Sequence, residues 1–70
     1  MPPSMKEVYS SHVGKVGYDD ETGDLYVEWS TGKTSVYHGV PPDVAEDVMG
    51  AYSVGSALAG LKGSYRHSYA

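Results

Sequence analysis

The residues best suited to chemistry in this chain lie between Ala51 and Ser56. Ser53, Gly55 and Ser56 follow a break between two helical patterns, which places them at the start of the second predicted helix. At such a start, hydroxyls and backbone N–H groups without helical acceptors can face an anion, and the helix dipole favours negative charge. The spacing therefore predicts a phosphate site. The simpler alternative is that Ser53 only caps the helix and Gly55 lets the helix approach the sheet.

Positive charge is concentrated in the same part of the chain. All nine acidic residues precede Val48, and the segment after it carries only the cations Lys62 and Arg66. Lys62 falls two helical turns after Gly55, so we expect it beside the phosphate, and the Arg66 guanidinium can hold phosphate bidentately. The segment 63–70 either packs across a neighbouring subunit or forms a disordered end.

Tyrosine is unusually frequent, with seven Tyr and no Phe in 70 residues. Its ring stacks on bases, and its hydroxyl suits wet interfaces. Tyr37, Tyr52 and Tyr65 lie nearest in sequence to the proposed motif, so we predict that they contact the ligand. A half-buried core position or a subunit contact is the alternative for each of them.

Other kinds of site find little support. The acidic turn Asp19–Asp24 offers oxygen ligands, but its spacing does not match an EF-hand loop. The three histidines lack metal-ligand spacing and the chain has no cysteine. No Ser-His-Asp or paired-carboxylate arrangement can be identified from the sequence, and His38 is the one residue of interest for proton chemistry. We therefore predict no metal, no cofactor and no enzyme activity.

Alternating and helical patterns indicate the elements that position these residues. Leu25, Val27 and Trp29 alternate with polar neighbours, which is typical of a half-buried strand. The predicted strands are 13–18, 25–30 and 34–38. A helical period begins at Pro41, and a second helix from Ser53 ends near Gly63.

These elements predict an α+β fold, in which a three-stranded antiparallel meander is followed by two short helices packed on one face. Val54, Leu58 and Leu61 share one face of the second helix, and Asp43 with Glu46 has the form of a capping box on the first. We assign residues 1–9 to an N-terminal tail and residues 10–70 to a single domain.

Size and charge limit the function. A chain of 70 residues buries only roughly 60% of its unfolded surface, and without cysteine it has no disulfide, so we expect a homo-oligomer. No apolar run approaches membrane-spanning length and no signal-peptide core is present, which predicts a cytoplasmic protein. A net charge of −4 argues against non-specific nucleic-acid binding, which needs many cations.

The order of short motifs resembles the KTSC domain, a family of about this length that also occurs at the C-terminus of some lysyl-tRNA synthetases and as free-standing phage and prophage proteins. The matching fragments are Ser10–Val13, Val16–Asp19, Leu25–Val27, Gly32, Tyr37–Pro41, Ala51–Gly55, Leu61–Lys62 and Tyr65. Two positions depart from the family pattern. Ser35 stands where a tyrosine is usual, and Ala57–Ala59 replace an aromatic pair and an Asn.

The resemblance implies a binding module. Together with the residues above, it predicts a non-enzymatic nucleotide binder, such as a phage sponge that sequesters cyclic mono- or dinucleotide signals of host defence at an oligomer interface. An accessory domain that binds RNA or tRNA is one alternative, and a structural domain for protein interaction is another.

Overall fold

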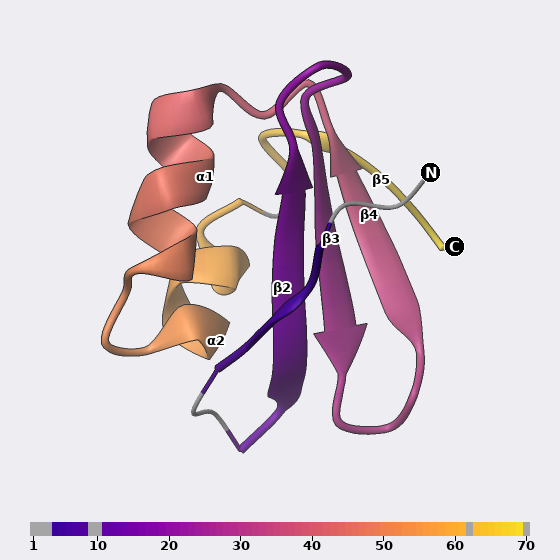
Figure 1. Ribbon diagram of the computed structural model, residues 1–70, viewed down its shortest axis with the longest axis vertical. Helices are drawn as coiled ribbons and strands as arrows, with labels where there is room; N and C mark the ends of the chain where they lie inside the picture. The colour runs from indigo at the N-terminus through magenta and orange to yellow at the C-terminus, as the bar shows by residue number, and fades with distance from the viewer. Residues whose placement is uncertain (1–3, 9–10, 62, 70) are drawn as a thin grey trace.

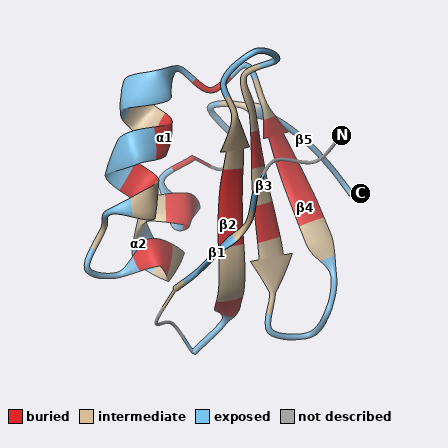
Figure 2. Ribbon diagram, in the orientation of Figure 1, coloured by how far each residue is buried: buried red, intermediate tan, exposed pale blue. Residues whose placement is uncertain are grey.

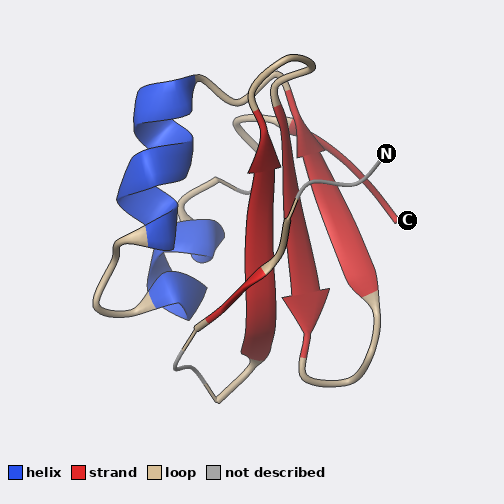
Figure 3. Ribbon diagram, viewed as in Figure 1, coloured by secondary structure: helices blue, strands red, loops and turns tan. Residues whose placement is uncertain are grey.

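The computed structural model describes residues 4–8, 11–61 and 63–69 and has two layers. A five-stranded antiparallel sheet forms one layer, and two helices cover one of its faces (Figures 1 and 3). The strands lie side by side in chain order, from β1 to β5. The elements are β1 (Lys6–Glu7), β2 (Val13–Asp19), β3 (Asp24–Trp29), β4 (Thr34–His38), α1 (Pro42–Met49), α2 (Val54–Ala59) and β5 (Arg66–Tyr69).

The α+β class and the central meander are confirmed, but the predicted number of strands was too small. The sheet gains one strand at each edge: β1, inside the predicted N-terminal tail, and β5, inside the C-terminal segment. The spacing of apolar residues cannot detect either strand. Two residues are too few to show alternation, and the polar sequence of β5 has no apolar face of its own.

The core lies between the helices and the inner face of the sheet. Leu25 and Val27 are fully buried there, and the predicted face of the second helix is confirmed, because Val54, Leu58 and Leu61 are all buried. Figure 2 shows this pattern, with the buried segments of the strands and helices facing the space between the layers.

The helix ends differ in part from the prediction. Ser53 caps α2 as expected, and its Oγ accepts a hydrogen bond from the Ser56 N–H. The capping box of Asp43 is wrong: α1 begins at Pro42, and its N-cap, Pro41, makes no side-chain hydrogen bond. Proline suits the first helical position because it has no N–H to satisfy, and Asp43 then falls inside the first turn, where a negative charge complements the helix dipole.

The second helix is also shorter than predicted. It ends at Ala59, and Gly60, with φ −70°, is its C-cap. Gly63, the predicted cap, instead takes φ +83° in the loop that leads to β5. This left-handed conformation is open to glycine and strained for other residues, so Gly63 directs the chain back to the sheet.

The acidic turn between β2 and β3 has a local structural explanation. Asp19 Oδ1 accepts hydrogen bonds from the N–H groups of Glu21 at 3.0 Å and Thr22 at 3.4 Å. Gly23 completes the turn with φ +76°. Within the described residues, no group of three or more His, Cys, Asp or Glu side chains is arranged to hold a metal ion.

In the same described part of the chain, neither helix has the length and apolar character needed to cross a bilayer.

Candidate ligand-binding site

The helices leave part of the inner sheet face open. Register places Ser35 beside Val27 and Tyr37 beside Leu25, so these β4 side chains share the helix-facing side of the sheet. Beyond them, the surface over β4 and β5 forms a groove of about 440 Å³. We call it the aromatic groove; it is lined by Trp29, Thr31, Lys33, Ser35, Tyr37, Gly63, Tyr65, His67 and Tyr69.

The floor of the aromatic groove is a fixed pair of side chains. The Trp29 indole N–H donates to Ser35 Oγ at 2.7 Å. Ser35 is the one polar side chain in the buried set of the described residues, and this bond satisfies it. Because a serine rather than a large ring stands at this position, the floor is low enough to leave the groove open.

The wall on the β5 side is made of rings in mutual contact. The His67 ring centroid lies 5.1 Å from that of Tyr37 and 5.0 Å from that of Tyr69, the second contact being edge-to-face. These are the separations of stabilising aromatic pairs. Tyr37 is buried, whereas Tyr69 remains 73% exposed, so one end of this wall is open to solvent.

The electrostatics of the aromatic groove differ from those of the whole chain. None of the nine acidic residues lies in its lining, while Lys33 does. Burial, and then the neighbouring Tyr69, raises the pKa of the Tyr37 phenol above its usual value of 10.0, so it stays neutral at physiological pH. A single negative charge on a ligand therefore meets a cation rather than carboxylates here.

The predicted phosphate site lies in a second pocket that shares a wall with the first. This α2 pocket, of about 350 Å³, is lined by Ser11, His12, Trp29, Ser53, Gly55, Ser56, Leu58 and Ala59. Trp29 belongs to both pockets, so it separates the helix start from the aromatic groove. The Ser53 and Ser56 hydroxyls are already bonded to each other at 3.1 Å, which matches the capping alternative as well as the anion hypothesis.

The predicted site residues are thus divided. Tyr37 and Tyr65 line the aromatic groove, whereas Ser53, Gly55 and Ser56 line the α2 pocket next to it.

Two of the remaining three predicted residues line neither pocket. Tyr52 is fully exposed in the loop between the helices. Arg66 pairs with His38 in the register of β4 and β5, so its side chain belongs to the outer face of the sheet, opposite the groove. Lys62 lies outside the described residues.

Sequence reasoning missed Trp29, Lys33 and His67 as candidate ligand contacts. The alternation Leu25–Val27–Trp29 did place Trp29 on the inner face, but no local pattern indicates that the helices stop short of it. His67 reaches the groove only because β5 joins the sheet. Lys33 reaches it because it lies in the turn between β3 and β4.

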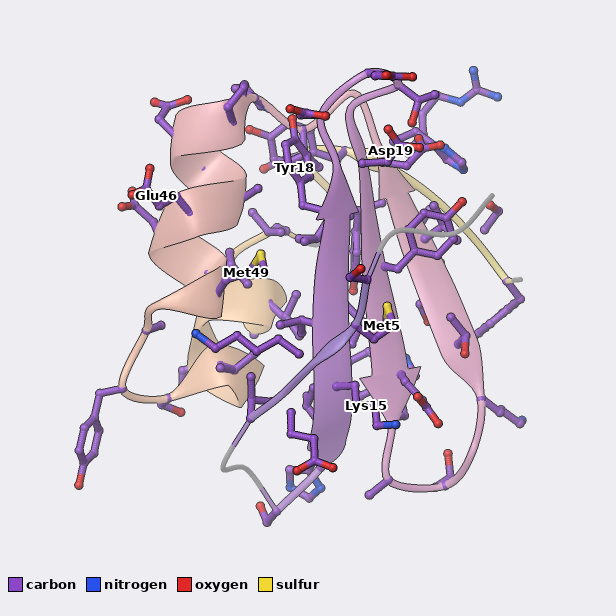
Figure 4. The ribbon with its side chains drawn as sticks, in the orientation of Figure 1. Met5, Lys15, Tyr18, Asp19, Glu46 and Met49 are labelled. Carbon is purple, nitrogen blue, oxygen red and sulfur yellow. The ribbon has the colours of Figure 1, made fainter. Side chains whose placement is uncertain are left out.

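A third hollow, of about 310 Å³, lies between α1 and the sheet. Tyr18 and Met49 belong to its wall, and Figure 4 shows Tyr18 near the end of β2 beside α1, with Met49 between α1 and the sheet. The Tyr18 hydroxyl donates to the Val40 carbonyl, so its polar end is already used by the fold. Its described wall carries one cation, Lys6, and one carboxylate, Glu46, so these charges offset each other and provide no net attraction for a phosphate.

The outer face carries a hydrogen-bonded chain of three side chains. His38 Nδ1 lies 2.9 Å from Asp24 Oδ1, and His38 Nε2 lies 2.7 Å from Ser68 Oγ. The order of atoms is that of a serine hydrolase triad. However, none of the three residues lines a pocket described above, so no substrate site accompanies them. The arrangement links β3, β4 and β5 across the sheet.

Comparison with known proteins agrees with this fold and names its family. The family model of the KTSC domain matches residues 9–66. The chain belongs to the KTSC domain family. The crystal structure of a KTSC domain protein from Yersinia pestis superimposes with a TM-score of 0.89 over 96% of both chains, at 28% sequence identity. A protein from Tsukamurella paurometabola is 35% identical over 57 residues, which is 81% of this chain and 85% of the relative.

Membership of the KTSC domain family confirms the resemblance read from the short motifs. The match spans β2 to the start of β5, so the strands and loops that line the aromatic groove lie largely inside it. Ser35, one of the two places at which this chain departs from the pattern stated above, lies at the floor of the aromatic groove. The departure therefore falls where it changes the shape of a pocket rather than the core.

Proposed function

We propose that this KTSC domain is a non-enzymatic nucleotide-binding module. The base lies in the aromatic groove against Tyr37, Tyr65 and His67, and the phosphate lies toward Lys33 or across Trp29 at the start of α2. The observation that carries the proposal is a groove of ring-bearing side chains that excludes every acidic residue of an acidic chain.

The chemistry of the lining suits a base more than a purely apolar ligand. Aromatic rings supply flat stacking surfaces, worth roughly 1–3 kcal/mol per base in proteins that bind single-stranded nucleic acids. Phenol and imidazole groups at the edges can also form hydrogen bonds with base edges. A volume of about 440 Å³ is within the range of small-molecule sites.

Sequestration rather than turnover fits the arrangement of the reactive groups. The described residues place the one Ser-His-Asp chain, Ser68–His38–Asp24, on the face opposite the aromatic groove. A ligand in the groove therefore has no activated nucleophile beside it. A cyclic dinucleotide, with two bases and two phosphates, also suits a site that a twofold axis repeats.

The proposal is tested by titrating the protein with nucleotides while its intrinsic fluorescence is measured, and by calorimetry of the same titrations. The chain has one tryptophan, and Trp29 forms part of the floor of the groove, so its emission reports binding directly. The panel contains nucleoside monophosphates, cyclic mononucleotides and cyclic dinucleotides, and chromatography of each mixture checks for products. We expect saturable binding of one class with intact ligand. No heat and no spectral change from any member would refute the proposal.

Binding of single-stranded RNA is the competing function. Its signature is an affinity for oligonucleotides that falls steeply with salt, because each neutralised phosphate releases counterions. The net charge of −4 opposes it, and among the described residues Lys33 is the one Lys or Arg in the lining of the aromatic groove. A steep salt slope with oligonucleotides, combined with no response to mononucleotides, would favour RNA.

A further inference from the structure

The two edges of the sheet are built differently. The edge strand β1 has only two residues, Lys6 and Glu7, both charged and exposed. Short charged edges of this kind resist pairing with other strands. The opposite edge, β5, is four residues long, has Arg66 as its single formal charge and contains neither proline nor a bulge. Of the two, β5 is the edge suited to pairing with another strand.

The direction of the backbone groups of β5 follows from the neighbouring hairpin. The Trp29 N–H donates to the Lys33 carbonyl at 2.7 Å, and the Gly32 N–H donates to the Trp29 carbonyl at 2.9 Å. Residues 29 and 33 therefore form a hydrogen-bonded pair, and such pairs alternate along antiparallel strands. Hence the backbone N–H and C=O groups of Ser35 and Tyr37 form their hydrogen bonds with β3.

The same alternation continues across the next pair of strands. Val36 and His38 direct their backbone groups to β5, where their register partners are Ser68 and Arg66. The N–H and C=O groups of the two remaining β5 residues, His67 and Tyr69, consequently point away from the sheet. The described residues provide no strand to receive them.

Like these outward backbone groups, the side chains of β5 are not covered by other parts of the described structure. All four are exposed, and two of them, His67 and Tyr69, line the aromatic groove. Figure 2 shows β5 as an exposed segment at the border of the molecule. One wall of the groove is therefore a single strand with no described strand on its outer side.

We propose that a second copy of this chain pairs with β5, antiparallel and edge to edge, about a twofold axis at Ser68. In this register His67 of each copy lies opposite the partner's Tyr69, so that all outward backbone groups of these two residues form hydrogen bonds. The facing His67 and Tyr69 rings lie on the same face, where cross-strand aromatic pairs stabilise sheets. The two Arg66 residues lie roughly 14 Å apart along the strands, which limits their repulsion.

A second copy is favoured over an unrelated strand because β5 is complementary to itself. The outward backbone groups of His67 and Tyr69 are two donors and two acceptors, and the twofold axis exchanges their positions. The rings of these two residues would also pack against the same rings of the second copy. A domain of this size has a small core and no disulfide, so burial against a second copy adds stability.

This pairing completes the aromatic groove. The open side along β5 receives the partner's His67 and Tyr69, and the two grooves become one ring-lined surface across the twofold axis. This step rests on the proposed nucleotide function and makes that function specific: the ligand carries two bases or two phosphates, as cyclic dinucleotides do. The dimer itself is independent of the ligand.

Backbone methylation gives the sharpest test of the interface. The chain is short enough for chemical synthesis, and N-methylation of the Tyr69 amide removes one outward donor while keeping every side chain. Light scattering and sedimentation should show a dimer for the unmodified chain at micromolar concentration and a monomer with native circular dichroism for the methylated one. The matched control is N-methylation of Ser68, whose amide points to β4, and it should lower the thermal midpoint. A monomeric unmodified chain, or a dimer that survives Tyr69 methylation, would overturn the proposal.

A disulfide reports the register. Facing residues in a non-hydrogen-bonded antiparallel pair have Cα atoms about 4.5 Å apart, within the range that a disulfide spans. Ser68→Cys should therefore form a covalent dimer under mild oxidation, whereas Ser64→Cys, exposed in the loop before β5, should remain a thiol. Equal cross-linking of both variants would refute a twofold axis at Ser68.

The two proposals fail separately. A dimer that binds no nucleotide leaves the interface standing and refutes the nucleotide function. A monomer that binds nucleotide does the reverse. If both are right, Tyr69 methylation weakens cyclic dinucleotide binding at least tenfold and changes mononucleotide binding less.

Discussion

His38 Nε2 lies 2.7 Å from Ser68 Oγ, across the junction of β4 and β5. The other ring nitrogen of His38 contacts Asp24 Oδ1 at 2.9 Å, so one imidazole connects three strands. Together with the ring contact between Tyr37 and His67, this hydrogen bond links the edge strand β5 to β4, and β5 forms one wall of the aromatic groove. A residue on one face of the sheet thus supports a pocket on the other.

Replacing His38 should loosen β5 before it unfolds the domain. A hydrogen bond contributes roughly 0.5–1.5 kcal/mol, and partial exposure places each of the two His38 bonds at the low end. Because His38→Ala removes both bonds, it should lower the free energy of unfolding by about 1 kcal/mol. Amide exchange should accelerate most at Arg66 and Ser68, the β5 residues whose backbone groups face β4. Ser64→Ala, an exposed change just before β5, is the control and should leave exchange unchanged. Uniform acceleration over the whole sheet would contradict a role at the edge.

We expect the hydrogen bond from Trp29 to Ser35 to hold the indole in place at the floor of the groove. Ser35→Ala leaves the indole N–H without its partner and should cost about 1 kcal/mol of stability, with a shift in tryptophan emission. Ser35→Thr keeps a hydroxyl and should restore the emission. Unchanged emission in the alanine variant would mean that the bond does not position Trp29.

Ser35→Tyr is the complementary change, because it returns this position to the family pattern described above. A tyrosine ring would occupy the space over β4, so nucleotide affinity should fall by roughly tenfold or more while the fold persists. Calorimetry measures the affinity, and thermal unfolding checks the fold. Affinity equal to that of the native chain would show that the ligand does not lie over Ser35.

Two tyrosines provide a matched pair for the binding hypothesis. Tyr65 lines the aromatic groove, whereas Tyr52 is fully exposed and lies in neither pocket, although both were predicted to contact ligand. Stacking is worth roughly 1–3 kcal/mol per base, so Tyr65→Ala should weaken nucleotide binding by about tenfold. Tyr52→Ala should have no effect on affinity. The opposite result would move the site to the loop between the helices.

Alkaline pH should destabilise the fold through Tyr37. Burial, and then Tyr69, raises its pKa above 10.0, so the folded phenol keeps its proton at a pH where the unfolded chain begins to lose it. The unfolded state then binds fewer protons, and stability falls as pH rises. The contribution is complete below about pH 10 and is lost as pH passes through the raised folded value. Chemical unfolding from pH 8 to 11 should show a smaller decline for Tyr37→Phe than for the native chain.

Local patterns were sufficient to predict the centre of the fold. Strand β4 was predicted at its observed bounds, and the other two meander strands within one residue at each end. Ser53 was predicted as the cap of α2, and the buried face of Val54 and Leu58 followed from helical spacing. These features depend on residues close together in sequence, so periodicity and capping rules detect them.

The aromatic groove could not be predicted in the same way. Tyr37 and Tyr65 were selected, but for their closeness to the helix motif rather than for a place beside Trp29 and His67. The groove exists because β5 joins β4 and because the helices end before they cover that part of the sheet. Both conditions depend on contacts between distant parts of the chain, which neither composition nor spacing records.

The start of α2 allows the two explanations of Ser53 to be separated. Its Oγ accepts from the Ser56 N–H and donates to Ser56 Oγ, so Ser53→Ala should cost about 1 kcal/mol of stability under either explanation. The explanations differ in nucleotide affinity: if Ser53 contacts a phosphate, affinity should fall even in a variant that keeps the helix cap. Ser53→Asp supplies that comparison, because aspartate caps a helix well and repels phosphate. Native stability with at least tenfold weaker binding would place a phosphate at this helix start, whereas native stability with native affinity would leave Ser53 as a cap and confine the ligand to the aromatic groove.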